Sequence, residues 1–474
     1  MKPADLSPAV RPTRVRYVVI AALCIAATVS YIQRNSYGGA ETTIRSELHL
    51  TPAQTGNAVS FFFLSYALLQ VPSGWLAQRA GPRLTLGCIA AGWSIALGLC
   101  AFAVNPATLI GGRVLMGVMQ AGIFPCSTLV VVAWLPPTQR GTASALLNSF
   151  MLIGGALSSN LTGLLIEPLG WRGLFMAFAV PGLVWALLFL VWFRNRPADH
   201  PAVNDAELLV IETKDPGAGK AAPQHVPVRW TALLFSGALY LICFQQFFRA
   251  GANRFFDNWF TTYLQEGRGV GVGFANQLAS LPQWLGVVGG LVGGALSDYL
   301  LVRTGSRRIA RQALAAAALV ACLVLYAFAY VIPDPTLATL TAAASFFIFS
   351  FSAPCAYALT MDMGGRNLGV VFGAMNMLGN FGAAAFTWAA PQLTDWVHVE
   401  RPPAFAAGVV GMSASPLAQG PLVAAPNVLA GPPHDWTPTL ILFFAMHVAA
   451  LLCWLPLNPN GVIGERAAAP ASKE

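Results

Sequence analysis

The sequence predicts an all-α polytopic membrane protein with twelve transmembrane helices in two pseudo-symmetric six-helix bundles. Composition gives the membrane class, because hydrophobic residues fill 56% of the 474 positions and charged residues only 10%, whereas soluble domains carry roughly a quarter charged residues. The mean hydropathy is +0.61. Charge-free windows recur at a length that can cross roughly 30 Å of hydrocarbon, about 20 residues for a helix. An internal repeat relates the two halves.

The candidate spans are stretches that contain no Asp, Glu, Lys or Arg. In chain order they are 17–33, 48–78, 84–112, 114–139, 141–166, 173–193, 230–248, 269–297, 312–333, 335–361, 367–394 and 437–464. Their polarity does not alternate as it would in the strands of a membrane barrel, so we expect helices.

A polar, Pro-containing segment divides these spans into two sets of six. We expect an N-terminal bundle at 1–194, a cytoplasmic linker at 195–228 and a C-terminal bundle at 229–474. Within the last, the segment 395–436 is rich in Pro, Gly and Ala and is expected to be a periplasmic loop, without an assigned role.

The formal net charge of +8 fits a topology signal better than a nucleic-acid surface, because no basic run with interleaved aromatic residues occurs. The basic residues that mark one side are Lys2, Arg11, Arg14, Arg16, Arg79, Arg83, Arg140, Arg303, Arg307, Arg308 and Arg311. By the positive-inside rule both termini are cytoplasmic, and we expect a bacterial inner (plasma) membrane location with the lipid bilayer as partner. The eight cysteines stand singly without CxxC spacing, so neither a metal nor a cofactor is expected.

The second and eighth spans end in related sequences. Gly74-Trp-Leu-Ala-Gln-Arg-Ala-Gly-Pro-Arg83 and Gly294-Ala-Leu-Ser-Asp298 lie 220 residues apart. Internal repeats of this kind in a membrane chain are typical of a transporter whose site lies between the repeats at mid-membrane.

The first copy resembles the loop signature Gly-x-Leu-x-Asp-Arg-x-Gly-x-Arg of the major facilitator superfamily, although Gln78 replaces its acidic residue. The second copy keeps the acidic residue as Asp298. The resemblance implies that these loops clasp the two halves together in one state. It therefore predicts gating roles for Arg79, Arg83, Asp298 and Arg307, with a plain topology signal as the alternative.

Within that superfamily the chain resembles the anion:cation symporter group, which includes sugar-acid transporters and the sialin and vesicular glutamate relatives. The matching motifs are Tyr31-Ile32-Gln33-Arg34 with Ala40, Arg113 to Gly117 with Gln120, Ala121 and Pro125, Trp134-Leu-Pro136, and Gly170-Trp171-Arg172. The group's acidic residues on spans 1 and 4 are Gln33 and Gln120 here, and glutamine cannot load and release a proton. Uniport, exchange or coupling through another group are the options that remain.

Arg34 is the first candidate for the site. It could be a boundary residue that reaches the headgroups, but the family match favours a cavity residue. The 220-residue offset maps Arg34 onto Arg254, and two guanidiniums could each grip a carboxylate or phosphate with paired hydrogen bonds. Alternatively, Arg254 pairs with Asp257 on the same helix face. Asp257 is either that counter-ion, which we favour, or a relocated proton carrier.

The remaining candidates are neutral or have two readings. Arg113 on span 4 could hold spans 1 and 4 together or meet an anionic ligand. Neutral groups that could bind substrate are Tyr31, Gln33, Tyr66, Gln120, Asn376 and Asn380. Asn376 and Asn380 share one face of span 11, where polar pairs also commonly bond neighbouring helices.

These observations predict a monomeric carrier of a small organic anion, a sugar acid or another carboxylate, that works by alternating access with atypical or absent proton coupling. The alternative is an organophosphate/phosphate exchanger of the same superfamily, which also uses paired arginines on spans 1 and 7. We expect no enzyme, because no Ser/His/Asp, HExxH or clustered acidic constellation lies near a membrane face.

Overall fold

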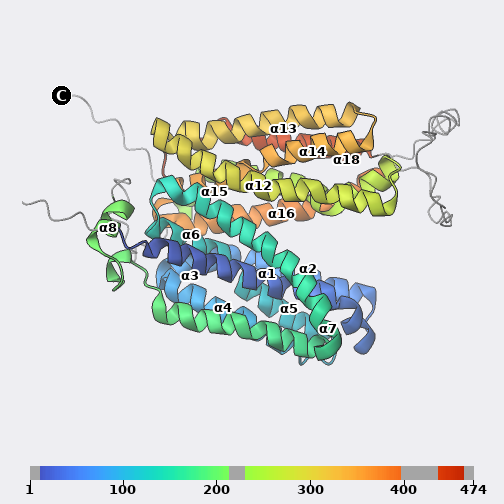
Figure 1. Cartoon of the computed structure of the whole chain (residues 1–474), viewed down its shortest axis with the longest axis horizontal. Helices are drawn as coiled ribbons and strands as arrows, with labels where there is room; N and C mark the ends of the chain where they lie inside the picture. The colour runs from blue at the N-terminus through green and yellow to red at the C-terminus, as the bar shows by residue number, and fades with distance from the viewer. Residues whose placement is uncertain (1–10, 213–229, 397–435, 464–474) are drawn as a thin grey trace, which may run out of the picture.

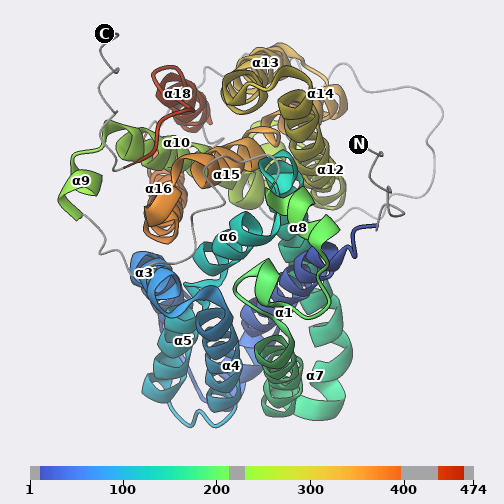
Figure 2. The same cartoon turned by 90° about the vertical axis from the view of Figure 1, so that its left-hand side faces the viewer.

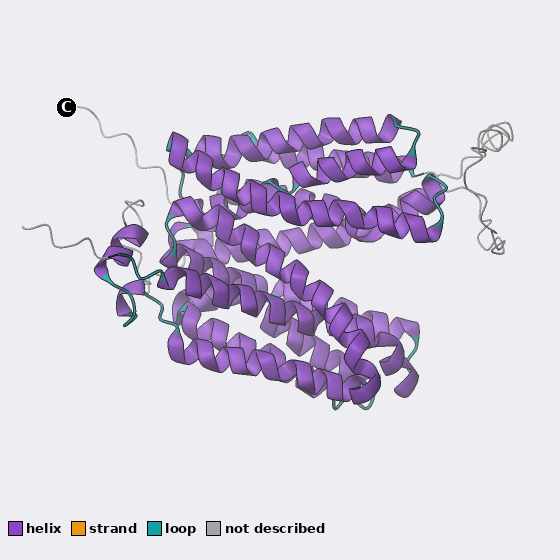
Figure 3. Cartoon of the chain, in the orientation of Figure 1, coloured by secondary structure: helices purple, strands orange, loops and turns teal. Residues whose placement is uncertain are grey.

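The computed structural model describes residues 11–212, 230–396 and 436–463, and every regular element in these ranges is a helix (Figure 3). Most of the predicted 395–436 loop, and residues 213–228 of the predicted linker, lie outside the described ranges. The helices form two bundles, one built from the first half of the chain and one from the second (Figure 1).

The first bundle begins with a long unbroken helix and contains two helices interrupted near their middle. Its elements are α1 (Val15–Glu47), α2 (Pro52–Leu68), α3 (Gln70–Ala80), α4 (Pro82–Cys100), α5 (Pro106–Gln120), α6 (Ile123–Trp134), the 3₁₀ turn η1 (Pro137–Gln139) and α7 (Arg140–Trp192). Capping boxes and a proline in the first turn start α2 at Thr51 and α5 at Asn105. The α2–α3 pair bends by 46°.

The second bundle is reached through the linker elements η2 (Pro197–Asp199) and α8 (Asp205–Glu212). Its elements are α9 (Trp230–Leu234), α10 (Gly237–Arg254), the π-helix η4 (Phe255–Trp259), α11 (Phe260–Thr262), the π-helix η5 (Tyr263–Gly267), α12 (Val272–Thr304), the π-helix η6 (Arg308–Ala313), α13 (Leu314–Val331), α14 (Pro335–Phe349), α15 (Ser352–Met363), the 3₁₀ turn η7 (Gly365–Asn367), α16 (Leu368–Trp396) and α18 (Thr437–Trp454).

Nine helices of the described chain are long and apolar enough to cross a membrane. One of them, Pro137–Trp192, is 56 residues long and turns at Gly170 (φ 64°), so it makes two passes. The bent α2–α3 pair adds another pass, and α10 with its π-helical continuation adds the last. The described chain therefore makes the twelve passes that the charge-free windows predict.

The Gly-Trp-Arg motif forms the turn inside α7. Trp171 Nε1 donates to Oε2 of Glu47 over 2.6 Å, and Arg172 pairs with the same carboxylate. Arg172 also donates to the carbonyl of Ala103 over 2.9 Å. The motif thus ties the ends of α1 and α4 to the turn in α7, which is a structural role.

The two bundles meet mainly at one end of the molecule. In Figure 1 their helices converge toward the end that carries α8, here called the linker end, and diverge toward the opposite end, here called the far end. Figure 2 looks onto the linker end and shows α3 and α6 of one bundle facing α15 and α16 of the other.

At the linker end the central linker holds the start of α1. Oε2 of the fully buried Glu207 accepts hydrogen bonds from the Val15 amide (3.0 Å) and the Thr13 hydroxyl (2.5 Å). Its other oxygen accepts from the Arg16 amide over 3.0 Å. A carboxylate in this position satisfies amides that a helix start leaves unbonded and complements the helix dipole.

Candidate functional site

Arg34 lies on α1 and is buried, with 8% of its surface exposed. Its guanidinium carbon lies 4.6 Å from the ring centre of Tyr31, 5.2 Å from that of Phe62 and 4.4 Å from that of Tyr66. We call these three rings the aromatic cage. Aromatic faces attract a desolvated cation by about 2 kcal/mol or more. The rings stabilise the charge of Arg34 without neutralising it, and Arg34 forms no ion pair with any described residue.

The guanidinium of Arg34 keeps unused hydrogen-bonding capacity. Its Nε donates to Oε1 of Gln120 over 2.9 Å, whereas its second terminal nitrogen is buried without a partner in the described chain. An arginine has five N–H donors in a fixed fork that matches a carboxylate. The free side of this fork has the geometry to accept an oxyanion.

Arg113 on α5 is a second buried guanidinium, with 2% of its surface exposed. It stacks between Tyr37 at 4.6 Å and Phe62 at 4.5 Å, so Phe62 contacts both arginines. Its Nη1 lies 3.6 Å from the Met116 sulfur, a long polar contact. Arg113 also has no carboxylate partner among the described residues, and it adds positive potential beside Arg34.

The two glutamines that replace the expected acids occupy different environments. Gln120 holds Arg34 and anchors itself by donating to the Ser30 carbonyl over 3.1 Å. Gln33 donates instead to the Phe178 carbonyl over 2.7 Å and to the Ser94 hydroxyl over 3.2 Å. Successive helix residues point about 100° apart, so Gln33 faces α4 and α7 while Arg34 faces α5. Of the two glutamines, it is Gln120 that contacts the Arg34 guanidinium.

The second bundle contributes Arg249 on α10, which is also 8% exposed. It donates to Oε1 of Gln246 over 3.1 Å and reaches the Tyr357 hydroxyl at 3.5 Å. The Tyr357 ring packs against Phe124 of the first bundle, with ring centres 5.8 Å apart. Gln120, which accepts a hydrogen bond from Arg34, lies about one helical turn before Phe124. Arg34 and Arg249 therefore approach the rings of Phe124 and Tyr357, here called the aromatic layer, from opposite bundles.

Arg254 does not join Arg34 in the described structure. It pairs with Asp257 over 3.0 Å, and the Arg254 side chain is 40% exposed. Asn253 also donates to that carboxylate, over 2.9 Å. The counter-ion geometry allowed by the three-residue spacing is therefore present, at the start of η4 near the end of α10.

The π-helices η4 and η5 explain why the repeat offset misses the buried arginine. Each single-turn π-bulge accommodates about one residue more than an α-helix, and α1 has no such segment. With two extra residues in the helix, the register argument matches Arg34 with position 252 rather than 254. Arg249 precedes that position by almost one turn and shares its face, whereas Arg254 points to the opposite side.

Asn376 and Asn380 lie on α16, and one of them bridges the bundles. Asn376 donates to Oε1 of Gln70, on α3, over 2.6 Å. Asn380 donates to the Asn376 carbonyl over 2.8 Å. Gln70 follows the caging Tyr66 by one turn across the α2–α3 break, so this contact closes the space next to the aromatic cage toward the linker end.

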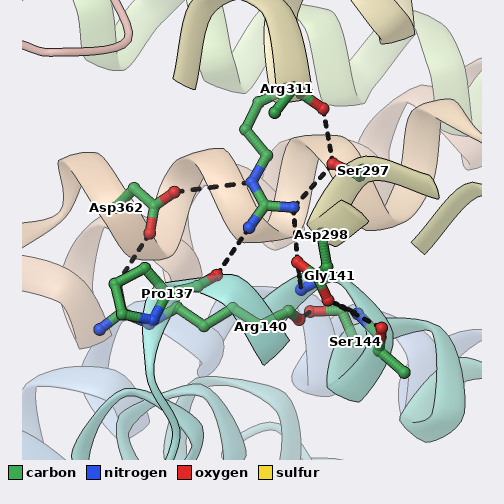
Figure 4. A network of polar contacts seen from close by, with 10 residues as sticks. Pro137, Arg140, Gly141, Ser144, Ser297, Asp298, Arg311 and Asp362 are labelled. Atoms are coloured by element: carbon green, nitrogen blue, oxygen red, sulfur yellow. Dashed lines mark hydrogen bonds and ion pairs between the residues drawn. The ribbon is translucent and has the colours of Figure 1, made fainter. Parts of the chain in front are cut away.

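The linker end is fastened by a set of four charged residues, which we call the clasp: Arg140, Asp298, Arg311 and Asp362 (Figure 4). Arg140, at the start of α7, pairs with Asp362 of α15 over 2.8 Å. Arg311 pairs with Asp298 over 2.9 Å and donates to the Pro137 carbonyl over 2.8 Å. All four side chains are at most 7% exposed, so these contacts form a buried connection between the bundles.

Asp298 also caps a helix of the other bundle. Its carboxylate accepts from the amides of Gly141 (3.1 Å) and Thr142 (2.7 Å), the first residues of α7. Gln78, which is 220 residues earlier, does the same for α16, because its Oε1 accepts from the Val370 amide over 3.1 Å. Its amide nitrogen donates to the Arg366 carbonyl. The repeat thus builds two equivalent caps, one charged and one neutral.

The other predicted gating arginines make different contacts. Arg79 stacks on Trp75 at 5.4 Å, and Arg83 donates to the Leu190 carbonyl over 2.8 Å, both within the first bundle. Arg307 lies at the start of η6. The clasp residues Arg140, Arg311 and Asp362 were not among the predicted gating residues. Neither loop motif contains Arg140 or Asp362, so the motifs could not predict this pair.

A membrane-spanning pair of helical bundles, with buried arginines that no described carboxylate pairs and a charged clasp at one end, is the architecture of a secondary transporter. The chain belongs to the Major Facilitator Superfamily, whose family model matches residues 23–387.

Similar curated proteins include bacterial transporters. The chain is 30% identical over 371 residues to a probable sulfoacetate transporter of Cupriavidus necator, covering 78% of this chain and 85% of that protein. It is 30% identical over 326 residues to a probable galactarate/D-glucarate transporter of Bacillus subtilis (65% and 70% covered). It is 27% identical over 365 residues to the hexuronate transporter of the same organism (76% and 84% covered).

Solved structures share the fold at low sequence identity. The proton:xylose symporter XylE, bound to 6-bromo-6-deoxy-D-glucose, superposes with a TM-score of 0.65 at 12% identity, covering 95% of this chain and 98% of that one. The transporter FucP in its outward conformation gives a TM-score of 0.60 at 15% identity, with 93% and 99% covered. These matches show the fold of two bundles.

Proposed function

We propose that the protein carries a small organic anion with two acidic groups across the membrane by alternating access. The observation that carries this proposal is Arg34, a buried guanidinium with a free hydrogen-bonding side and no carboxylate partner among the described residues. A charge near the bilayer centre costs on the order of 3 kcal/mol and persists where it has a function. A carboxylate or sulfonate supplies the missing partner.

A second acidic group is expected because Arg249 faces the same layer from the other bundle. Its guanidinium has only neutral partners, Gln246 and Tyr357. An anion that bridges Arg34 and Arg249 draws the bundles together, which is how a ligand favours the closed site over the open one. Two of the reported relatives support this class, because sulfoacetate, galactarate and D-glucarate each carry two acidic groups, whereas the hexuronate named for the third carries one.

The clasp supports alternating access. It joins the bundles at the linker end only, so separating Arg140 from Asp362 and Asp298 from α7 would open that end. We place the linker end in the cytoplasm of a bacterium, because most of its loops carry the basic residues that the positive-inside rule assigns there. The state described here is then closed to the cytoplasm.

Binding of D-glucarate to the purified protein, measured by isothermal titration calorimetry, tests the proposal. Arg34→Lys should weaken binding by about 10- to 100-fold, because an ammonium cannot reproduce the paired hydrogen bonds of the fork. Arg83→Lys is the matched control, since Arg83 donates to a backbone carbonyl at the linker end. Equal affinity of wild type and Arg34→Lys would show that Arg34 does not bind the anion. Tighter binding of glucose 6-phosphate than of D-glucarate would favour the organophosphate alternative.

A further inference from the structure

Several arginines of the described chain are matched by a carboxylate, whereas those of the candidate site are not. Arg140 and Arg311 are matched by Asp362 and Asp298, while Arg254 is matched by Asp257. At the site, Arg34, Arg113 and Arg249 are all buried, and none forms an ion pair with any described residue. The site therefore holds three guanidiniums whose charge no described residue matches, and an incoming anion would match it.

From this surplus we infer that the transporter is an obligate exchanger: it changes the side to which its site opens only with an anion bound. The inference rests on the proposed function, since it concerns the same site and the same class of substrate. It adds that one organic anion must leave for another to enter, and that no proton or metal cation is needed as a coupling ion.

Sealing the site removes water from its charged groups. A carrier passes between its two open states through one in which the site is sealed from both sides, and sealing strips water from the charged groups. Arg34 and Arg113 stack on the same ring at 5.2 and 4.5 Å. Their guanidinium carbons are thus less than about 10 Å apart, a separation at which buried charges repel with little screening. The loss of water and the repulsion between the guanidiniums both disfavour the sealed state without a ligand.

The described groups around the three arginines leave their positive charge unmatched. A carboxylate beside the arginines would match it in the empty carrier, but the side chain that touches Arg34 is the amide of Gln120. The other polar groups around the arginines are the hydroxyls of Tyr31, Tyr37, Tyr66 and Tyr357 and the amide of Gln246. Phenols and amides stay neutral at physiological pH. No described residue in contact with the three arginines brings negative charge, so the substrate must bring it.

Binding of the anion changes the charge of the site. A dianion neutralises most of the surplus and gives the arginines hydrogen-bond partners, so sealing the site removes water from an ion-paired cluster rather than from bare cations. Arg34 belongs to the first bundle and Arg249 to the second, so the same anion also draws the two halves together. Loaded carriers therefore cross and empty carriers do not.

Transport in proteoliposomes tests the inference. Uptake of radiolabelled D-glucarate should be at least about tenfold faster into vesicles preloaded with unlabelled D-glucarate than into empty vesicles, with potassium and valinomycin clamping the membrane potential. Equal rates would overturn obligate exchange. Absence of uptake even into preloaded vesicles would overturn the proposed substrate class and the inference with it, so the two failures are distinguishable.

Two variants test the charge argument itself. Gln120→Glu places a carboxylate against Arg34 Nε and should raise uptake into empty vesicles several-fold relative to exchange. Arg113→Gln removes one positive charge and should act in the same direction. Gln54→Glu, which adds the same charge at the capping box of α2, is the matched control and should leave the ratio unchanged. If neither site variant raises the ratio of net uptake to exchange, the surplus charge is not what prevents the unloaded carrier from changing the side to which its site opens.

Discussion

Gly74 on α3 and Gly369 on α16 lie in direct backbone contact across the two bundles. A Cβ added to Gly74 would lie 2.0 Å from the Gly369 carbonyl oxygen, and one added to Gly369 would lie 2.4 Å from that of Gly74. The repeat builds a second contact of the same kind, because a Cβ on Gly294 would lie 2.7 Å from the Gly141 carbonyl oxygen. The closed linker end thus depends on pairs of glycines that let backbones approach.

Gly74→Ala should therefore shift the protein toward the state that is open at the linker end. The added methyl group has no space in the closed state, where overpacking typically costs about 1–3 kcal/mol, and the clash disappears when the bundles separate. Spin labels at the exposed positions Leu84 and Val302, one in each bundle, should report a longer distance between them. Gly111→Ala, at a glycine with open space around its Cβ position, is the control. An unchanged distance in Gly74→Ala would contradict the prediction.

The two helix caps at the linker end should differ in strength. Asp298→Asn removes the charge that α7 and Arg311 share, and breaking a buried pair costs about 3–5 kcal/mol because it leaves the partner uncompensated. Gln78→Ala removes a neutral cap, which should cost about 1 kcal/mol. The same spin-label distance should therefore lengthen more in Asp298→Asn than in Gln78→Ala. Equal effects would mean that the helix cap, rather than the ion pair, carries the closure.

The overall fold was predictable because each membrane pass needs its own charge-free window and the positive side marks its ends. The Gly74 and Gly294 repeat also predicted equivalent positions, and Asp298 and Gln78 do cap equivalent helices. The Gly170 turn, by contrast, becomes understandable only in the structure, where Trp171 and Arg172 share Glu47.

The burial of two candidate arginines agrees with the sequence analysis, while their role in binding stays a prediction. Arg34 and Arg113 lie in the motifs that carry the family resemblance, and both are buried. The sequence could not place Arg249, because the two π-helices change the helical register without changing the number of residues between the repeats. Nor could it separate Gln33 from Gln120, since which glutamine touches Arg34 depends on how α1 packs against α4, α5 and α7.

Arg249 and Arg254 should respond differently to removal of their charge. Arg249→Gln should weaken binding of the dianion D-glucarate by about tenfold or more while changing binding of the monoanion D-glucuronate little, because a single acidic group is satisfied at Arg34. Arg254→Gln is the matched control, since that charge is already paired with Asp257 at an exposed position. Calorimetric titration of both ligands into both variants gives the comparison. A larger loss of D-glucarate affinity in Arg254→Gln would show that Arg254, the residue that the 220-residue offset indicates, binds the second acidic group.

Docking of α8 onto α1 should resist acid down to low pH. Burial by itself raises the pKa of Glu207, but the hydrogen bonds from Thr13, Arg16 and Val15 and the Arg16 charge outweigh it, so the pKa lies below its ordinary range. The contribution of such a group to stability is fully present above its pKa in the unfolded chain, about 4.3, and is lost as the pH falls through the lower folded value. Docking should thus be constant from pH 8 to 5 and fail only below about pH 4.

Hydrogen exchange of the peptide that contains α8 provides the measurement. In the wild type its protection should not change between pH 8 and 5, after correction for intrinsic exchange. In Glu207→Gln it should fall at every pH, because removing a buried charged acceptor costs about 1.5–3 kcal/mol. Asp205→Asn alters an exposed carboxylate on the same helix and should leave protection unchanged. Release of α8 between pH 7 and 5 in the wild type would show that Glu207 titrates near its ordinary pKa or above it, and that the amides of α1 do not hold its charge.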